Sequence, residues 1–285
     1  MSKLSFKTSL IRILPVFIFI GMKIILSRKG FDSSAGKQAS PILPDGTLLS
    51  LPIPSFDDNV GFSDLSYEGQ SYQSIINSLN PRNKVGAMCH LDPDIRPELR
   101  PRDPAWLPAF GQMDAALTSL RNNNVSDGDL FLFFGWFRPT EYDAKGMLKY
   151  QKKAPHLHII YGYMEVGEII TDLKSVPDWL SDHPHTAYTK AWYEGRNALF
   201  IATKQLSIAP ELPGAGSLTM RNDRVLTKPG YSRRFWSLPD FFKKVKISYH
   251  PSPWVNGCFK SVGRGQEFVM DGIPEIIDWA RNIIV

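Results

Sequence analysis

The sequence predicts an α+β fold, a single domain with a mixed, mostly antiparallel sheet and a few flanking helices. Short apolar runs bounded by turn residues recur along the chain, which is typical of strands. Strands and helices do not alternate regularly, whereas a doubly wound parallel sheet requires such alternation. No internal repeat and no step in composition divides the chain, so one domain is expected.

Six apolar or β-branched runs predict strands, at residues 23–27, 130–137, 156–166, 199–203, 245–249 and 267–270. Four further segments predict helices, at residues 71–79, 107–121, 238–243 and 274–284. The stretch SDGDLFLFFGWFR illustrates the reasoning: its Asp-Gly pair supplies a turn. The run from Leu130 to Phe134 that follows is apolar on both faces, as expected of a central strand.

The first 21 residues differ from the rest. Lys3, Lys7 and Arg12 precede the apolar run 13–22, and no acid is present. A mis-assigned start codon, a signal or uncleaved anchor and a structural helix are the alternatives. A bilayer span needs about 20 apolar residues, but Lys23 interrupts this run, and no small-residue cleavage site follows. We expect residues 1–21 to be a mis-assigned or signal-like extension, residues 22–285 to form the domain, and no stable membrane association.

Charge and cysteine content narrow the functional classes. The chain carries a formal charge of +5, and removing the three cations of the first 21 residues leaves +2 for residues 22–285. This gives weak electrostatic support for nucleic-acid binding. The basic clusters, including Arg233-Arg234, are interpreted as solvated surface. Cys89 and Cys258 form no disulfide framework, so a reducing cytoplasm is the expected location.

The histidines lie in four places: His90, His156 with His158, His183 with His185, and His250. A spacing of two in an extended segment points both imidazoles to one side, which suits a metal site. Asp92 and Asp94 add possible ligands. The spacing is generic, however, and histidine also binds substrates. A metal is therefore the less favoured interpretation, and no metal ligand is assigned.

Several motifs, read in order, carry a family resemblance. They are MKIILSRKGFDSSAG, SPILPDGTLLSLPIP, HLDPDIR, FGQ, GDLFLFFGWFR, HPH, WSLP, SYH and GRGQEFVMD. Together they resemble the nucleotide modification associated domain family, third type, over essentially residues 22–285. The resemblance implies a part in nucleotide or nucleic-acid base modification, in bacteria and their phages. It implies no particular reaction and no catalytic residues.

The C-terminal motif supplies a mechanistic lead. Glu267 follows Gly263 and Gly265 and enters a strand, a position suited to holding charge against a substrate. The motif weakly resembles the glutamate-bearing strand of DNA-directed ADP-ribosyltransferases over about twenty residues. That resemblance implies NAD as a possible cofactor, with Arg28 contacting the dinucleotide. A carboxylate there stabilises an oxocarbenium-like cation.

These considerations give the expected site. Glu267, Asp32 and Asp92 are the candidate catalytic acids and bases. Substrate binding is expected of residues at strand ends or in polar loops: Arg28, Lys29, Asp45, His90, Asp94, Gln112, Arg138, His183, His185 and Gln266. Eight residues are expected to converge on one cleft: Arg28, Lys29, Asp32, His90, Asp92, Asp94, Arg138 and Glu267.

Three functions compete. A nucleotide- or base-modifying enzyme is favoured over a metal-assisted hydrolase that uses the histidine pairs, and over a non-catalytic nucleic-acid-binding module. Aromatic side chains suit stacking on a base in the first and third cases, although most are expected in the core: Trp106, Trp136, Phe137, Trp192, Trp236 and Trp254. The sequence does not distinguish free nucleotide, DNA and RNA as the substrate.

Overall fold

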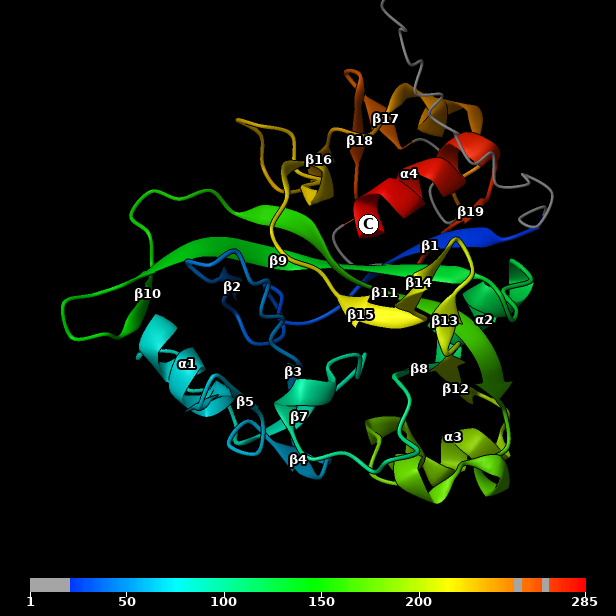
Figure 1. Ribbon diagram of the computed structural model, residues 1–285, viewed down its shortest axis with the longest axis horizontal. Helices are drawn as coiled ribbons and strands as arrows, with labels where there is room; N and C mark the ends of the chain where they lie inside the picture. Colours follow the sequence, from blue (N-terminus) through cyan, green and yellow to red (C-terminus); the bar gives the residue numbers. More distant parts are fainter. Residues whose placement is uncertain (1–20, 249–252, 263–266) are drawn as a thin grey trace, which may run out of the picture.

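The computed structural model describes residues 21–248, 253–262 and 267–285 (Figure 1). Within them the main sheet has nine strands, and its principal path runs β19-β1-β9-β11-β12-β8. The bounds along this path are Phe268–Asp271, Lys23–Arg28, Leu130–Tyr142, Leu157–Ile170, Asn197–Ala202 and Ala109–Met113. Strands β2 (Ser40–Ile42) and β10 (Leu148–Tyr150) also pair with β9, and β15 (Ala215–Ser217) pairs with β11.

The sheet is mixed and mostly antiparallel, so the predicted α+β class is confirmed. Strands β1 and β2 run parallel to β9, and the other pairs within the sheet are antiparallel. Strand β9 alternates between two cores, because successive side chains of a strand point to opposite faces. Leu132 and Phe134 face the first core, while Phe131 and Phe133 face the second.

Helix α4 (Pro274–Ile284) and the C-terminal strands cover the first core (Figure 1). Proline stands at the first helical position of α4, where its missing N–H costs no hydrogen bond. Ile276, Ala280 and Ile283 form the buried stripe of this helix. The 3-10 helix η7 (Asp240–Lys244) and a small sheet of β16 (Phe235–Trp236), β17 (Trp254–Val255) and β18 (Cys258–Lys260) complete this layer.

The sheet curls around its second core. Strands β11 and β12 separate β8 from β9, yet the Phe110 ring of β8 lies 5.0 Å from that of Phe131 and 5.4 Å from that of Phe133. The curl also brings the two edges of the principal path together, because Gln112 on β8 donates a hydrogen bond to Glu267, which precedes β19.

A third layer lies below the sheet in Figure 1, around helix α1 (Tyr72–Leu79), which Ser71 caps through its side chain. It includes β3 (Ile53–Ser55), β4 (Val60–Gly61), β7 (Met88–His90) and the hairpin of β5 (Ser66–Tyr67) with β6 (Gln70–Ser71). Helices α2 (Asp114–Asn122) and α3 (Thr189–Tyr193) flank β8 and β12, and β13 (Gln205–Leu206) pairs with β14 (Ala209–Pro213).

Most predicted elements are confirmed, and three need correction. The predicted helix 107–121 begins as strand β8, because residues 109–113 pair with β12, and only then becomes α2. The predicted helix 238–243 is the 3-10 helix η7. In place of a strand at 245–249, Ile247 makes an isolated bridge to Met270. Residue 249, like residues 1–20, lies outside the described residues, so the boundary expected at residue 22 remains a prediction.

Cys89 and Cys258 are both free and buried. Among the helices of the described residues, none combines the length and apolar character needed to cross a membrane.

Candidate functional site

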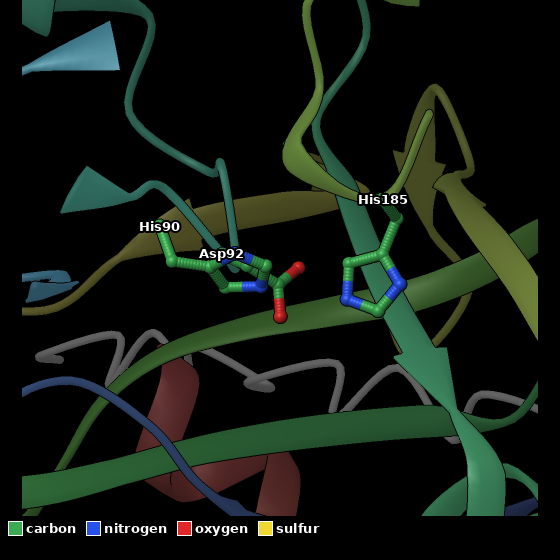
Figure 2. Close-up of side chains that lie close together, drawn as sticks. All are labelled: His90, Asp92 and His185. Carbon is green, nitrogen blue, oxygen red and sulfur yellow. The ribbon is translucent and has the colours of Figure 1, made fainter. Parts of the chain in front are cut away.

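Four residues, His90, Asp92, His183 and His185, meet at the open side of edge strand β8, and we call them the His–Asp cluster. His90 ends β7, Asp92 follows in the next loop, and the other two histidines belong to or flank the 3-10 helix η5 (Pro184–Ala187). Figure 2 shows the rings of His90 and His185 on either side of the Asp92 carboxylate. One nitrogen or oxygen atom of each of these three residues lies within 4.8 Å of the others.

Asp92 is a buried, ionised carboxylate. Its Oδ1 accepts the backbone N–H of Gly111 at 2.6 Å, and its Oδ2 lies 3.4 Å from Lys29 Nζ. Burial opposes ionisation, but Lys29, His183 and His185 outweigh it and hold the pKa of Asp92 well below its usual range. A carboxylate with so low a pKa is a weak general base near neutral pH. Charge stabilisation or metal binding fits Asp92 better than proton abstraction.

Hydrogen bonds fix the orientation of both outer imidazoles. His90 Nδ1 lies 2.9 Å from Asp58 Oδ2, and His185 Nδ1 lies 2.7 Å from Asn197 Oδ1. The Asn197 amide is itself oriented, because its Nδ2 donates to the carbonyl of His185. Nδ1 of His185 is therefore the donor, which leaves the lone pair of the neutral ring on Nε2. Burial lowers the pKa of His185 to about 4 despite the opposing charge of Asp92.

Gly111 makes room for this arrangement. A Cβ atom at this position would lie 2.2 Å from the His185 ring. The absence of a side chain on β8 therefore lets the imidazole lie directly against the strand.

Glu267 occupies the neighbouring position between the sheet edges. Its Oε1 accepts hydrogen bonds from Ser27 Oγ and Gln112 Nε2, its Oε2 has no partner among the described residues, and the residue is 4% exposed. Neighbouring residues connect the two acids: Ser27 in β1 contacts Glu267, and Lys29, just after β1, contacts Asp92. From β8, Gln112 donates to Glu267 and the N–H of Gly111 donates to Asp92.

Glu267→Ala is expected to lower the free energy of unfolding by about 1–3 kcal/mol, because it leaves two buried donors without an acceptor. Glu267→Gln is expected to cost less, since an amide oxygen can accept both bonds from Ser27 and Gln112. Urea denaturation of both variants measures the difference. A glutamine variant that loses as much stability as the alanine variant would show that the negative charge itself holds the structure together.

A second site lies across β1. A cleft of about 370 Å³ is lined by Arg28, Phe31, Asp32, Ser33, Ser34, Trp136, His158, Arg233, Arg234 and Val262. We call it the arginine cleft. The guanidinium of Arg233 lies 4.2 Å from the centre of the Trp136 ring and donates to Ser33 Oγ at 2.6 Å. Arg28 belongs to both the cleft and β1, next in sequence to Lys29 of the other site.

Asp32 orders the loop that forms one wall of the cleft. Its Oδ1 accepts the N–H of Ser34 and of Ala35, each at 2.7 Å, and its Oδ2 lies 3.8 Å from Arg28. Burial opposes ionisation, but the bonds from Ala35 and Ser34 and the charge of Arg28 lower the pKa of Asp32. Its contacts make Asp32 an organiser of the loop.

The histidine pair at the start of β11, His156 just before the strand and His158 within it, does not join the His–Asp cluster. His156 Nδ1 accepts from Trp136 Nε1 at 3.0 Å, and His158 Nδ1 accepts from Trp236 Nε1 at 3.1 Å. Burial, followed by the charges of Arg233 and Arg28, lowers the pKa of His158 to about 3. A metal site built from both pairs, as considered from the sequence, is not formed.

The predicted site residues therefore divide between two places. Lys29, His90, Asp92, Gln112, His183, His185 and Glu267 gather at the β8 edge, while Arg28 and Asp32 line the arginine cleft. Convergence of all eight on one cleft is not observed, because neighbouring residues of β1 point to opposite faces. Gln266 and His250 lie outside the described residues.

Three predicted residues have other partners. Asp94 is paired with Arg102 through two bonds of 2.6 Å. Asp45 accepts a hydrogen bond from the N–H of Thr47 in a turn. Arg138 donates to the carbonyl of Gln151 and does not line the arginine cleft. Of the aromatics, Phe137, Trp192 and Trp236 are buried, Trp254 packs against the first core and Trp106 lies against Arg102. Trp136 lines the cleft.

Sequence reasoning missed Asp58, Asn197 and Gly111, which support the His–Asp cluster from distant segments. It also interpreted Arg233-Arg234 as surface, although both line the cleft. No signal next to this pair indicated the cleft, because the aromatic ring against Arg233 is that of Trp136, almost one hundred residues earlier.

Comparison with protein families gives one assignment. The model of nucleotide modification associated domain 3 matches residues 23–271. Searches of curated proteins and of solved structures gave no significant match. Since the matched segment covers most of the chain, and contains both the His–Asp cluster and the arginine cleft, the chain belongs to the nucleotide modification associated domain 3 family.

Proposed function

We propose that this protein binds a nucleotide, free or within a nucleic acid, in the arginine cleft and takes part in modifying its base. The observation that carries the proposal is the lining of the cleft, which includes Arg28, Arg233 and Arg234 together with the ring of Trp136. Guanidinium groups bind phosphate through paired, charge-assisted hydrogen bonds, and an aromatic face stacks on any base.

The size and charge of the cleft support a nucleotide. Its volume of about 370 Å³ falls in the range of small-molecule sites, about 300–1,000 Å³. Its acid, Asp32, already accepts bonds from its own loop, so the arginines dominate the charge that a ligand meets. Contacts to Ser33 and Trp136 hold Arg233 before a ligand arrives, which reduces the entropy lost on binding.

The geometry bears on the reaction as well. Glycosyl transfer from NAD, as the ADP-ribosyltransferase resemblance implies, requires one ligand to reach both Arg28 and Glu267. Glu267 contacts Ser27, whose side chain leaves β1 on the face opposite to Arg28, so these contacts do not favour that reaction. The His–Asp cluster, which Lys29 contacts directly after the end of β1, is the better candidate for the reactive centre.

Arg233→Ala is expected to weaken nucleotide binding by about 10- to 100-fold, because each charge-assisted hydrogen bond contributes about 1.5–3 kcal/mol. Calorimetric titration with the four ribonucleoside and four deoxynucleoside monophosphates, and with a short single-stranded DNA, measures the change. Arg221→Ala is the matched control, since Arg221 is half-buried, paired with Asp223 and outside the cleft.

Equal binding by the Arg233 and Arg221 variants would remove the arginine cleft from the proposal. The modification is tested separately by nucleoside mass spectrometry. DNA and RNA from cells that carry the wild-type gene, the Arg233→Ala gene or no gene are compared. We expect a modified nucleoside in the first sample alone, and its mass identifies the reaction.

A further inference from the structure

We propose that His90, Asp92 and His185 bind a divalent first-row transition metal, Zn²⁺ or Fe²⁺. This inference concerns the His–Asp cluster and does not depend on nucleotide binding in the arginine cleft. Two imidazoles and one carboxylate form a ligand set used for both ions in proteins. The three ligand-capable atoms already lie within 4.8 Å of one another, so modest side-chain movement brings them to a common ion.

The surrounding hydrogen bonds are those of a metal site. A metal-binding imidazole usually donates its second N–H to a carboxylate or amide oxygen, which orients the ring. In the same way, Asp58 Oδ2 accepts a hydrogen bond from His90 Nδ1, and Asn197 Oδ1 accepts one from His185 Nδ1. The atom left available on each ring is Nε2, and that of His185 faces the Asp92 carboxylate (Figure 2).

Two buried polar atoms in and around the cluster lack a partner in the part of the chain that the structure describes. His183 is 3% exposed, and its Nε2, 3.6 Å from Asp92 Oδ1, makes no hydrogen bond within the described residues. Oδ1 of Asp58 is also buried without a partner there. Buried polar groups are rarely left in this state unless a ligand or ion completes the site. His183 Nδ1 accepts the N–H of His185 at 3.3 Å, so its Nε2 carries the proton. His183 is therefore a donor beside the Asp92 carboxylate and is not counted among the metal ligands.

The charge of the cluster favours a cation. Asp58 and Asp92 are two buried carboxylates, and Lys29, 3.4 Å from Asp92 Oδ2, is the cation in contact with Asp92 in the described part of the chain. With neutral imidazoles this leaves a net negative site, which a divalent ion compensates. Lys29 and the N–H of Gly111 each use one oxygen of Asp92, and a carboxylate has about four lone-pair directions.

Three protein ligands leave coordination positions open. Structural zinc sites are closed by four protein ligands, whereas catalytic sites keep a position for water or substrate. A metal held here is therefore of the reactive kind, able to activate water or polarise an oxygen of the substrate.

Metal content tests the proposal directly. The full chain, purified without a polyhistidine tag, is incubated with Zn²⁺, or anaerobically with Fe²⁺, dialysed, and analysed by plasma mass spectrometry. We expect about one ion per chain for the wild type and for the control His156→Ala, whose ring lies outside the cluster. Asp92→Asn and His90→Gln are expected to lose at least nine-tenths of the bound metal.

Two further measurements keep the test decisive. Zn²⁺ is expected to raise the melting temperature of the wild type, since a ligand of the folded state stabilises it, and to leave that of His90→Gln unchanged. Co²⁺ is expected to give a d–d absorption band in the wild type and in His156→Ala, and none in His90→Gln. A wild type with neither bound metal nor a thermal shift overturns the proposal, and so does equal metal loss in His156→Ala. Arg233→Ala is expected to keep its metal, which separates this result from failure of the nucleotide site.

Discussion

Trp236→Ala is expected to lower the free energy of unfolding by about 3–5 kcal/mol, the range measured when a large aromatic is removed from a core. Trp236 is 0% exposed. Its ring lies 4.9 Å from that of Phe134, 5.1 Å from Phe259 and 5.9 Å from Phe268, so it joins the main sheet to the small C-terminal sheet. Its Nε1 also donates to His158 and to the carbonyl of Arg233.

Urea denaturation followed by circular dichroism measures the loss. Tyr193→Ala is the control, because Tyr193 is 83% exposed and its removal is expected to change stability by less than about 0.5 kcal/mol. A similar effect of both substitutions would show that the C-terminal layer contributes little to the stability of the sheet.

Acid is expected to destabilise the protein through His158. Burial lowers the pKa of His158 from 6.5 to about 3. The unfolded chain therefore binds a proton as the pH falls below about 6.5, while the folded chain stays neutral until about 3. Stability from this residue is complete above pH 6.5 and is lost as the pH falls toward 3. The linkage amounts to about 3 kcal/mol between pH 7 and pH 4.

The comparison with His158→Asn isolates this residue from the other titrating groups. Asparagine keeps an acceptor for the Trp236 N–H but does not titrate in this range. For each protein, the unfolding free energy at pH 4 is subtracted from that at pH 7. This loss of stability should be larger for the wild type than for His158→Asn by about 3 kcal/mol. Equal differences would mean that His158 is protonated in the folded protein at pH 4.

Local patterns predicted the elements that depend on local chemistry. The turn before Leu130, the apolar run of β9 and the amphipathic spacing of α4 are all readable in a short window. Strand β8 was wrongly predicted as helix. Ala109 to Met113 forms a strand only because it pairs with β12, which lies almost ninety residues later and is not visible in a local window. The curl that places Phe110 against Phe131 has no signal in either segment.

The candidate site shows the same limit. The short spacings between His90 and Asp92 and between His183 and His185 made these residues site candidates, but did not predict that the two segments lie side by side. That arrangement depends on two loops docking on β8 and on Gly111 leaving space for an imidazole. Arg233 was interpreted as surface because a pair of cations usually is. Its role in the cleft depends on Trp136, almost one hundred residues earlier.

The loop that carries Asp92 also protects a sheet edge. Asp94 exchanges two backbone hydrogen bonds with Ala109, and the Asp92 side chain accepts the N–H of Gly111, so this loop occupies the outer side of β8. An uncovered edge strand is a template for pairing with another chain and for aggregation. The same loop therefore both covers the edge of β8 and carries Asp92 of the His–Asp cluster. Substitutions that release the loop from β8 expose backbone groups able to recruit a second molecule, and loss of the site and loss of solubility are coupled in this fold.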